Sequence, residues 1–168
     1  MKPILATLRT VSALALLYVG AGLCVGSGPA FAQTKNFHPV KPQGLFDSGR
    51  YSHVIEVDKG KLIYIAGQVP ADDKGQLVGK GDFKAQAVKT WENVMLALKS
   101  VGLDASDVIK INVYVVDLPQ NMAGYREARL QFFPQSMAQQ PTSTLIGVSS
   151  LASEGQLIEV EAVAVTRQ

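Results

Sequence analysis

From residue 51 onward, the pattern of hydrophobic and polar positions predicts several short strands and two helices. Stretches rich in β-branched residues and bounded by glycine, proline or aspartate are typical of strands. The expected strands are residues 52–57, 62–66, 108–116, 142–148 and 157–165. Asp58-Lys59-Gly60 is expected to form the turn between the first two strands, and residues 67–81, which are rich in glycine and aspartate, are expected to form a loop.

Two segments have hydrophobic residues at the three- and four-residue steps of an amphipathic helix. Asp82 is the expected N-cap of the first helix, and Gly102 stands where a glycine commonly ends one. The second helix is expected to begin at Asp117 and Pro119 and to end before Pro134. The expected buried positions are Val88, Trp91, Met95, Leu98 and Val101 in the first helix, and Met122, Tyr125, either Arg129 or Leu130, Phe132 and Phe133 in the second.

The resulting order, ββαβαββ, predicts an α+β domain whose strands have two different faces. One face is purely hydrophobic and suits two packed helices; its members are Ile109, Ile111, Val113, Val115, Ile158, Val160, Ala162 and Ala164. The opposite face is mixed and includes Lys110, Asn112, Tyr114, Glu159, Glu161 and Val163. A face that is partly hydrophobic and partly polar favours contact with another subunit, so we expect a homo-oligomer. A sheet with one solvated face is the alternative.

Residues 1–32 are expected to form a cleavable signal peptide. Lys2 and Arg9 give a short positive segment, the hydrophobic run 11–25 follows, and Ala30-Phe31-Ala32 has the small residues of a cleavage site before Gln33. An uncleaved membrane anchor is the alternative, but the run is short for a membrane span. Glycine residues also interrupt it, namely Gly20, Gly22 and Gly26. We therefore expect an exported protein, periplasmic or secreted, with no membrane attachment after cleavage.

The remaining chain is expected to comprise an extended N-terminal arm, residues 33–50, and one domain, residues 51–168. The arm contains prolines and glycines and little periodicity. The chain has 16 Lys and Arg against 14 Asp and Glu, and the signal peptide holds Lys2 and Arg9 but no acidic residue. The mature domain is therefore close to neutral, which argues against a nucleic-acid partner.

Few residues offer catalytic chemistry. Cys24 is the only cysteine and is removed with the signal peptide, while His38 and His53 lack further ligands at metal-binding spacing, so we expect no metal or other cofactor. Glu159 and Glu161 share one strand face, about 6.5–7 Å apart by strand rise. Such a pair could perform general acid–base catalysis. Equally, each carboxylate could pair with a Lys or Arg such as Lys110.

Several motifs resemble the Rid family, also called RidA-like or YjgF-like. The resemblance covers roughly residues 45–166, with the motifs in the family order and at family-like spacing. They are Gly49-Arg50-Tyr51-Ser52, Tyr64-Ile65-Ala66-Gly67-Gln68, the segment from Val94 through the loop Gly102 to Val108, Val113 to Leu118, Pro141-Thr142-Ser143-Thr144, and Ile158 to Ala164. The resemblance implies a chorismate-mutase-like fold with one mixed sheet and two helices on one face. It also implies a homotrimer in which three sheets form a barrel-like core, with small-molecule pockets between subunits.

The resemblance further implies hydrolysis of small imines and enamines derived from amino acids. Glu161 is then the catalytic residue, and the substrate-binding residues are Tyr51, Ala66, Ser143 and Leu145. Active deaminases of the family grip the substrate carboxylate with an arginine where this chain has Ser143. Because a serine cannot form a bidentate, charge-assisted pair, weak or no activity on 2-aminoacrylate-derived imines is expected. An arginine from another segment, Arg50, Arg126 or Arg129, would favour catalysis.

Two functions therefore remain open on the sequence. The first is a diverged deaminase-like hydrolase that acts on C=N bonds, with Tyr51 and Ser143 orienting the substrate or water. The second is a non-catalytic trimer that binds a metabolite or a partner protein in the same clefts.

Overall fold

Both expected helices form, and their capping residues define where they begin and end. The computed structural model describes residues 35–167. α1 spans Phe83–Ser100, and the Asp82 side chain accepts a hydrogen bond from the backbone N–H of Ala85. Gly102 follows α1 and has a φ of 75°. This left-handed conformation commonly ends a helix, and glycine adopts it without steric strain. α2 spans Leu118–Phe132 and begins after Asp117, with Pro119 in its first turn.

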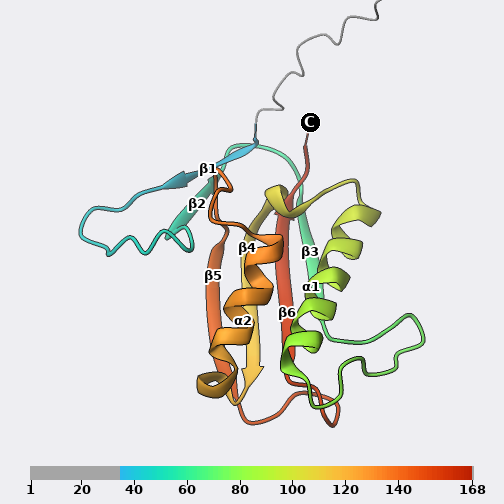
Figure 1. Cartoon of the computed structure of the whole chain (residues 1–168). Coiled ribbons are helices and arrows are strands. Elements are labelled where there is room, and N and C mark those ends of the chain that lie inside the picture. Colours follow the sequence, from blue (N-terminus) through green and yellow to red (C-terminus); the bar gives the residue numbers. More distant parts are fainter. Residues whose placement is uncertain (1–34, 168) are drawn as a thin grey trace, which may run out of the picture. The chain divides into compact units, whose positions relative to one another are not determined.

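The main sheet contains four strands in the order β3-β6-β4-β5. These strands are Leu62–Gln68 (β3), Val108–Val116 (β4), Thr142–Val148 (β5) and Ile158–Val165 (β6). β6 lies between β3 and β4 and is antiparallel to both, whereas β4 and β5 are parallel and are connected through α2. The predicted α+β class with a mixed sheet is confirmed (Figure 1).

A second, two-stranded sheet lies outside the main sheet. Phe37–Val40 (β1) pairs antiparallel with Val54–Val57 (β2). The sequence analysis predicted no strand within residues 33–50, and it placed residues 52–57 in the same sheet as 62–66. The structure corrects both points. β1 is only four residues long and contains Pro39, so its sequence shows no alternation of hydrophobic and polar residues that would predict a strand. An edge strand nevertheless tolerates a proline.

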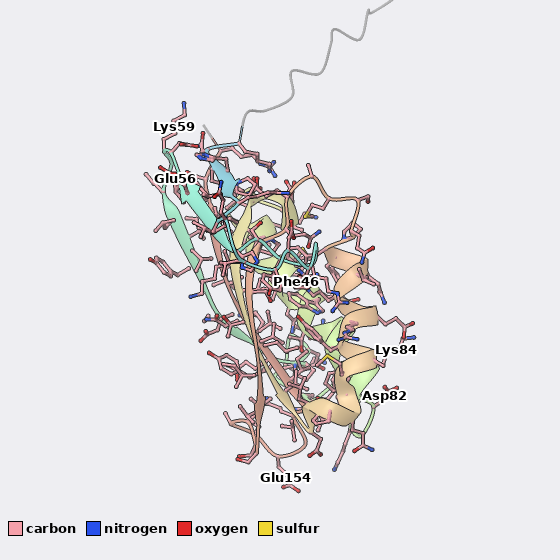
Figure 2. The ribbon with its side chains drawn as sticks, turned by 90° about the vertical axis from the view of Figure 1, so that its left-hand side faces the viewer. Phe46, Glu56, Lys59, Asp82, Lys84 and Glu154 are labelled. Carbon is pink, nitrogen blue, oxygen red and sulfur yellow. The ribbon has the colours of Figure 1, made fainter. Side chains whose placement is uncertain are left out.

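The two helices cover one face of the main sheet, and Figure 2 shows both on the same side. The residues of β4 and β6 that face them are buried as predicted: Ile111, Val113, Val115, Ile158, Val160, Ala162 and Ala164. Ile109 is an exception, because a bulge between Val108 and Lys110 shifts the register of β4 against β6. Val108 therefore occupies the core, and Ile109 is only half-buried.

The helices meet each other through aromatic side chains. Trp91 is fully buried and lies against the rings of Phe132 and Phe133, with centroids 6.3 and 5.5 Å away. The buried stripe of α1 differs at its end from the prediction, because Val101 follows the helix and is 48% exposed. In α2 the alternative is decided in favour of Arg129, since Leu130 is 43% exposed.

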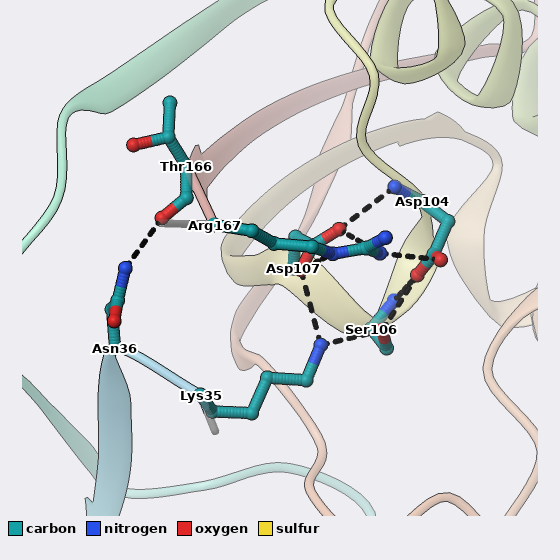
Figure 3. Close-up of polar contacts among 7 residues, drawn as sticks. All are labelled: Lys35, Asn36, Asp104, Ser106, Asp107, Thr166 and Arg167. Carbon is teal, nitrogen blue, oxygen red and sulfur yellow. Dashed lines mark hydrogen bonds and ion pairs between the residues drawn. The ribbon is translucent and has the colours of Figure 1, made fainter. Parts of the chain in front are cut away.

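A charged cluster joins the two ends of the described chain to the 3₁₀ turn Ala105–Asp107 (Figure 3). The Asp107 side chain is 1% exposed and accepts hydrogen bonds from Lys35, Arg167 and the backbone N–H of Asp104. Arg167 also pairs with Asp104. This cluster fixes the segment that precedes β1 and the end of β6 to the same turn.

The predicted signal peptide, residues 1–32, lies outside the described residues. Within residues 35–167, no helix combines the length and hydrophobicity that a membrane span requires.

Candidate functional site

Three of the predicted site residues, Tyr51, Ser143 and Leu145, line one cavity of about 490 Å³. Ser143 and Leu145 lie two residues apart on β5 and therefore share a face of that strand. Tyr51 is in the loop that leads into β2. The other wall is α2, which contributes Met122, Tyr125, Arg126, Arg129 and Leu130. We call this space the Ser143 cavity.

The Ser143 cavity contains all three arginines that the sequence analysis considered as replacement cations: Arg50, Arg126 and Arg129. Arg50 and Arg126 are exposed, whereas Arg129 is 8% exposed. The Nη2 group of Arg129 donates to the backbone carbonyl of Arg50 and to Oε1 of Gln140, each at 3.1 Å. These bonds connect the Arg129 side chain of α2 to the loops that precede β2 and β5.

Burial changes the acid–base properties of this cavity. Desolvation raises the pKa of Tyr125, although the charge of Arg129 and the hydroxyl of Ser143 act in the opposite direction. Desolvation also lowers the pKa of Arg129 from its ordinary value. An arginine remains protonated despite such a shift, so the cavity carries permanent positive charge.

The other two predicted site residues, Ala66 and Glu161, line a separate cavity of about 480 Å³ on the face of the sheet that the helices leave uncovered. We call it the Glu161 cavity. Its further lining residues include Tyr64, Lys110, Asn112 and Val163. Tyr64 is 75% exposed in the single chain, so one protomer leaves this hydrophobic ring uncovered.

Two side chains of β4 position the Glu161 carboxylate. Asn112 Nδ2 and the Tyr114 hydroxyl donate to Glu161 Oε2, at 3.2 and 3.3 Å. Desolvation, followed by the negative charge of Glu161, raises the pKa of Tyr114. Among residues 35–167, neither Glu161 nor Glu159 forms an ion pair, so the predicted alternative of pairing with Lys110 is not observed within one protomer.

Glu159 has a different neighbour. Its carboxylate lies over Gly67 of β3, where an added Cβ would be 1.8 Å from Glu159 Oε1. Gly67 is therefore required for the close approach of the Glu159 side chain to β3. Of the two glutamates, only Glu161 lines a cavity described above.

The sheet order separates the two groups of site residues. Ser143 is on β5 and Ala66 is on β3, which are opposite edges of the sheet. Three interstrand spacings of about 4.8 Å place these edges roughly 14 Å apart. A single protomer therefore does not bring Ser143 and Ala66 to one small ligand.

The sequence analysis placed Asn112 and Tyr114 on the mixed face but did not assign them to the site. Their assignment requires the register that aligns Asn112 with Glu161 and Tyr114 with Glu159. The signal available in the sequence was their alternation on the same face as the glutamates. No group of three His, Cys, Asp or Glu side chains within the described range has the arrangement to hold a metal ion.

Comparisons with known proteins agree with this architecture. The family model described as Endoribonuclease L-PSP matches residues 43–166. A RutC family protein of Pyrococcus horikoshii is 36% identical over 116 residues, which cover 69% of this chain and 86% of the relative. The 2-iminobutanoate/2-iminopropanoate deaminase of Salmonella typhimurium is 34% identical over 115 residues, covering 68% and 88%.

A solved structure of the Rid protein YyfB from Yersinia pestis superposes with a TM-score of 0.70 at 31% identity, covering 78% of this chain and 99% of that one. Residues 43–166, which the family model matches, contain β2 to β6, both helices and all five predicted site residues. The chain therefore belongs to the Endoribonuclease L-PSP family, the Rid proteins that its motifs resemble.

Proposed function

We propose that this Rid protein is exported and hydrolyses the C=N bond of a small imine or enamine in a pocket completed between the subunits of a homotrimer. The observation that carries the proposal is the separation of the site residues. The Ser143 and Glu161 cavities each contain part of the predicted site and lie toward opposite edges of one sheet. A second protomer that places its β3 edge beside β5 would unite them.

The two cavities contribute different steps. The Ser143 cavity supplies guanidinium groups that hold an anionic substrate. In the Glu161 cavity the carboxylate accepts a proton from water as the water oxygen attacks the imine carbon. The carboxyl group then gives this proton to nitrogen, which completes the carbinolamine. The carboxylate next takes the proton of the new hydroxyl group and passes it to nitrogen, the carbon–nitrogen bond breaks, and ammonia and a carbonyl product leave. Asn112 and Tyr114 keep Glu161 oriented for both transfers.

The Salmonella relative supports this reaction class, because that protein is a 2-iminobutanoate/2-iminopropanoate deaminase by name. Ser143 argues for a changed substrate preference. A neutral hydroxyl in place of an arginine loses about 2–4 kcal/mol of transition-state binding for a small carboxylate, or 30- to 1,000-fold in rate. We therefore expect poor hydrolysis of 2-aminoacrylate-derived imines.

A coupled assay tests the proposal. An enzyme that releases 2-aminoacrylate generates the imine, and the keto acid is followed with this protein, without it, and with an arginine-bearing relative. The expected result is a small acceleration or none. Ser143→Arg is then expected to raise the rate, because it restores a bidentate partner for the carboxylate.

Two outcomes would contradict the proposal in different ways. Acceleration equal to that of the arginine-bearing relative would show that the substrate preference has not changed. No acceleration with any imine, for the unmodified protein and for Ser143→Arg, would exclude hydrolysis and leave a binding role.

A further inference from the structure

The lining of the Ser143 cavity is positively charged and has no acidic residue. Arg50, Arg126 and Arg129 all lie there. None of them takes part in an ion pair in the part of the chain that the structure describes. Charged side chains that are almost fully buried are usually paired, so the lack of a counter-ion for Arg129 needs an explanation.

The geometry of Arg129 is that of a preformed anion-binding group. Nη2 is held by the Arg50 carbonyl and by Gln140, and the guanidinium lies 5.4 Å from the centre of the Phe133 ring. The Nε and Nη1 groups of Arg129 donate to no residue within 35–167. Neither atom is completely buried, so a ligand in the cavity can reach them. Nε donates on the Nη2 side of a guanidinium, as in the pair of Arg167 with Asp107, so Nε and Nη1 do not form one fork. Nη1, with its two N–H donors, therefore remains for a carboxylate oxygen of a ligand.

We infer that Arg129, with Arg126 at the rim, binds the carboxylate of the ligand and replaces the cation that other family members carry at position 143. Because Arg129 comes from α2, it holds the carboxylate on the opposite wall of the cavity from β5. In an α-imino acid the imine carbon is bonded directly to this carboxylate, so the partner subunit's Glu161 must reach it at this wall. This inference rests on the proposed function, since it specifies the substrate class of that site.

The hydrophobic side chains of the cavity indicate the chemical character of the rest of that ligand. Met122, Leu130 and Leu145 line the same cavity, whose volume of about 490 Å³ exceeds what a three-carbon acid fills. The ligand class is therefore an α-imino acid, or the corresponding α-oxo acid product, with a branched or extended hydrophobic side chain.

Calorimetric titration of the purified protein with three probes tests this inference. The probes are 4-methyl-2-oxopentanoate, pyruvate, and 4-methyl-2-pentanone, which has the same hydrophobic body as the first but no carboxylate. We expect the first probe to bind at least about tenfold more tightly than either of the others, because only it contacts both the guanidinium and the hydrophobic wall.

Two variants locate the carboxylate. Arg129→Lys keeps the charge but loses the planar guanidinium that the Arg50 carbonyl and Gln140 hold in place, and it is expected to weaken binding of the oxo acid about 10- to 100-fold. Arg126→Gln changes an exposed residue and is expected to weaken it about two- to fivefold. Lys99→Gln, an exposed charge change at the end of α1 away from the cavity, is the control and should have no effect.

If Arg129 had a purely structural role, its replacement would distort the cavity and would weaken binding of the oxo acid and binding of the ketone equally. Equal loss for both probes, or an unchanged preference in both arginine variants, would overturn the inference even if the protein hydrolyses imines. A selective loss of oxo acid binding supports it, and would do so even if no imine were hydrolysed and the proposed reaction were wrong.

Discussion

Glu159 and Glu161 carry the same side chain on the same face of β6, yet their surroundings differ. Glu161 accepts hydrogen bonds from Asn112 and Tyr114 and lines a cavity, whereas Glu159 lies over Gly67. A general acid–base residue must reach the substrate or its attacking water. The assignment of catalysis to Glu161 therefore depends on its neighbours and not on its residue type.

Replacing Glu161 by glutamine is expected to lower the rate of imine hydrolysis about 10²- to 10⁴-fold, because the amide cannot accept the proton of the attacking water. Binding of the oxo acid product should change little, since its carboxylate is held in the other cavity. Steady-state kinetics and calorimetry measure the two effects. Glu159→Gln is the matched control on the same strand, and an equal loss of rate in both variants would contradict the assignment.

At the scale of elements, the charged cluster around Asp107 joins three segments that are far apart in the sequence. Lys35 precedes β1, Arg167 follows β6, and Asp107 closes the 3₁₀ turn before β4. Hydrogen bonds from Ser106 and Arg167 lower the pKa of Asp104 to about 2, outweighing the opposing effect of partial burial. The cluster therefore links the stability of the domain to pH.

Arg167→Gln is expected to reduce the free energy of unfolding at neutral pH by about 1–3 kcal/mol, because buried Asp107 loses a charged donor. The folded pKa of Asp104 is below its unfolded value, so the stabilisation is complete above about pH 4 and is lost as the pH falls toward 2. Urea unfolding at several pH values should show that the unmodified protein loses more stability over this range than the variant.

Lys59→Gln removes one exposed positive charge that forms no ion pair within the described residues. It is the control for the Arg167 experiment and should keep the stability and the acid dependence of the unmodified protein. Identical acid dependence in the Arg167 variant and in the unmodified protein would show that the cluster does not set it.

For the whole molecule, the uncovered face of the sheet determines the expected assembly. Val163 lies on this face beside Tyr64 and Glu161. Val163→Lys is expected to dissociate the trimer, because a buried unpaired charge costs several kcal/mol. Light scattering measures the mass in solution. Leu96→Lys, at an exposed position of α1, should leave the trimer intact, and a monomeric unmodified protein would contradict the proposed assembly.

The expected signal peptide leads to a separate prediction about the N-terminus of the mature protein. Cleavage after Ala30-Phe31-Ala32 would leave Gln33 as the first residue. N-terminal sequencing of the protein from the periplasm or the medium should therefore begin at Gln33. An intact Met1 in the membrane fraction would instead indicate an uncleaved anchor.

The sequence alone determined the type and limits of most elements. Strands β4 and β5 have the predicted bounds, and Asp82 and Gly102 cap α1 as expected. These features depend on periodicity, capping and turn residues, which act over a few neighbouring positions. The family motifs are also contiguous in the sequence, and they were sufficient to identify the family and the candidate site residues.

Only the tertiary structure decided which distant segments meet. It paired β1 with β2, placed β6 between β3 and β4, and thereby put Asn112 and Tyr114 against Glu161. It also buried Arg129 in place of Leu130. A two-residue period tells which residues share a face of a strand, but it contains no information on the neighbouring strand or its register. The separation of the predicted site residues toward two sheet edges therefore became visible only in the folded chain.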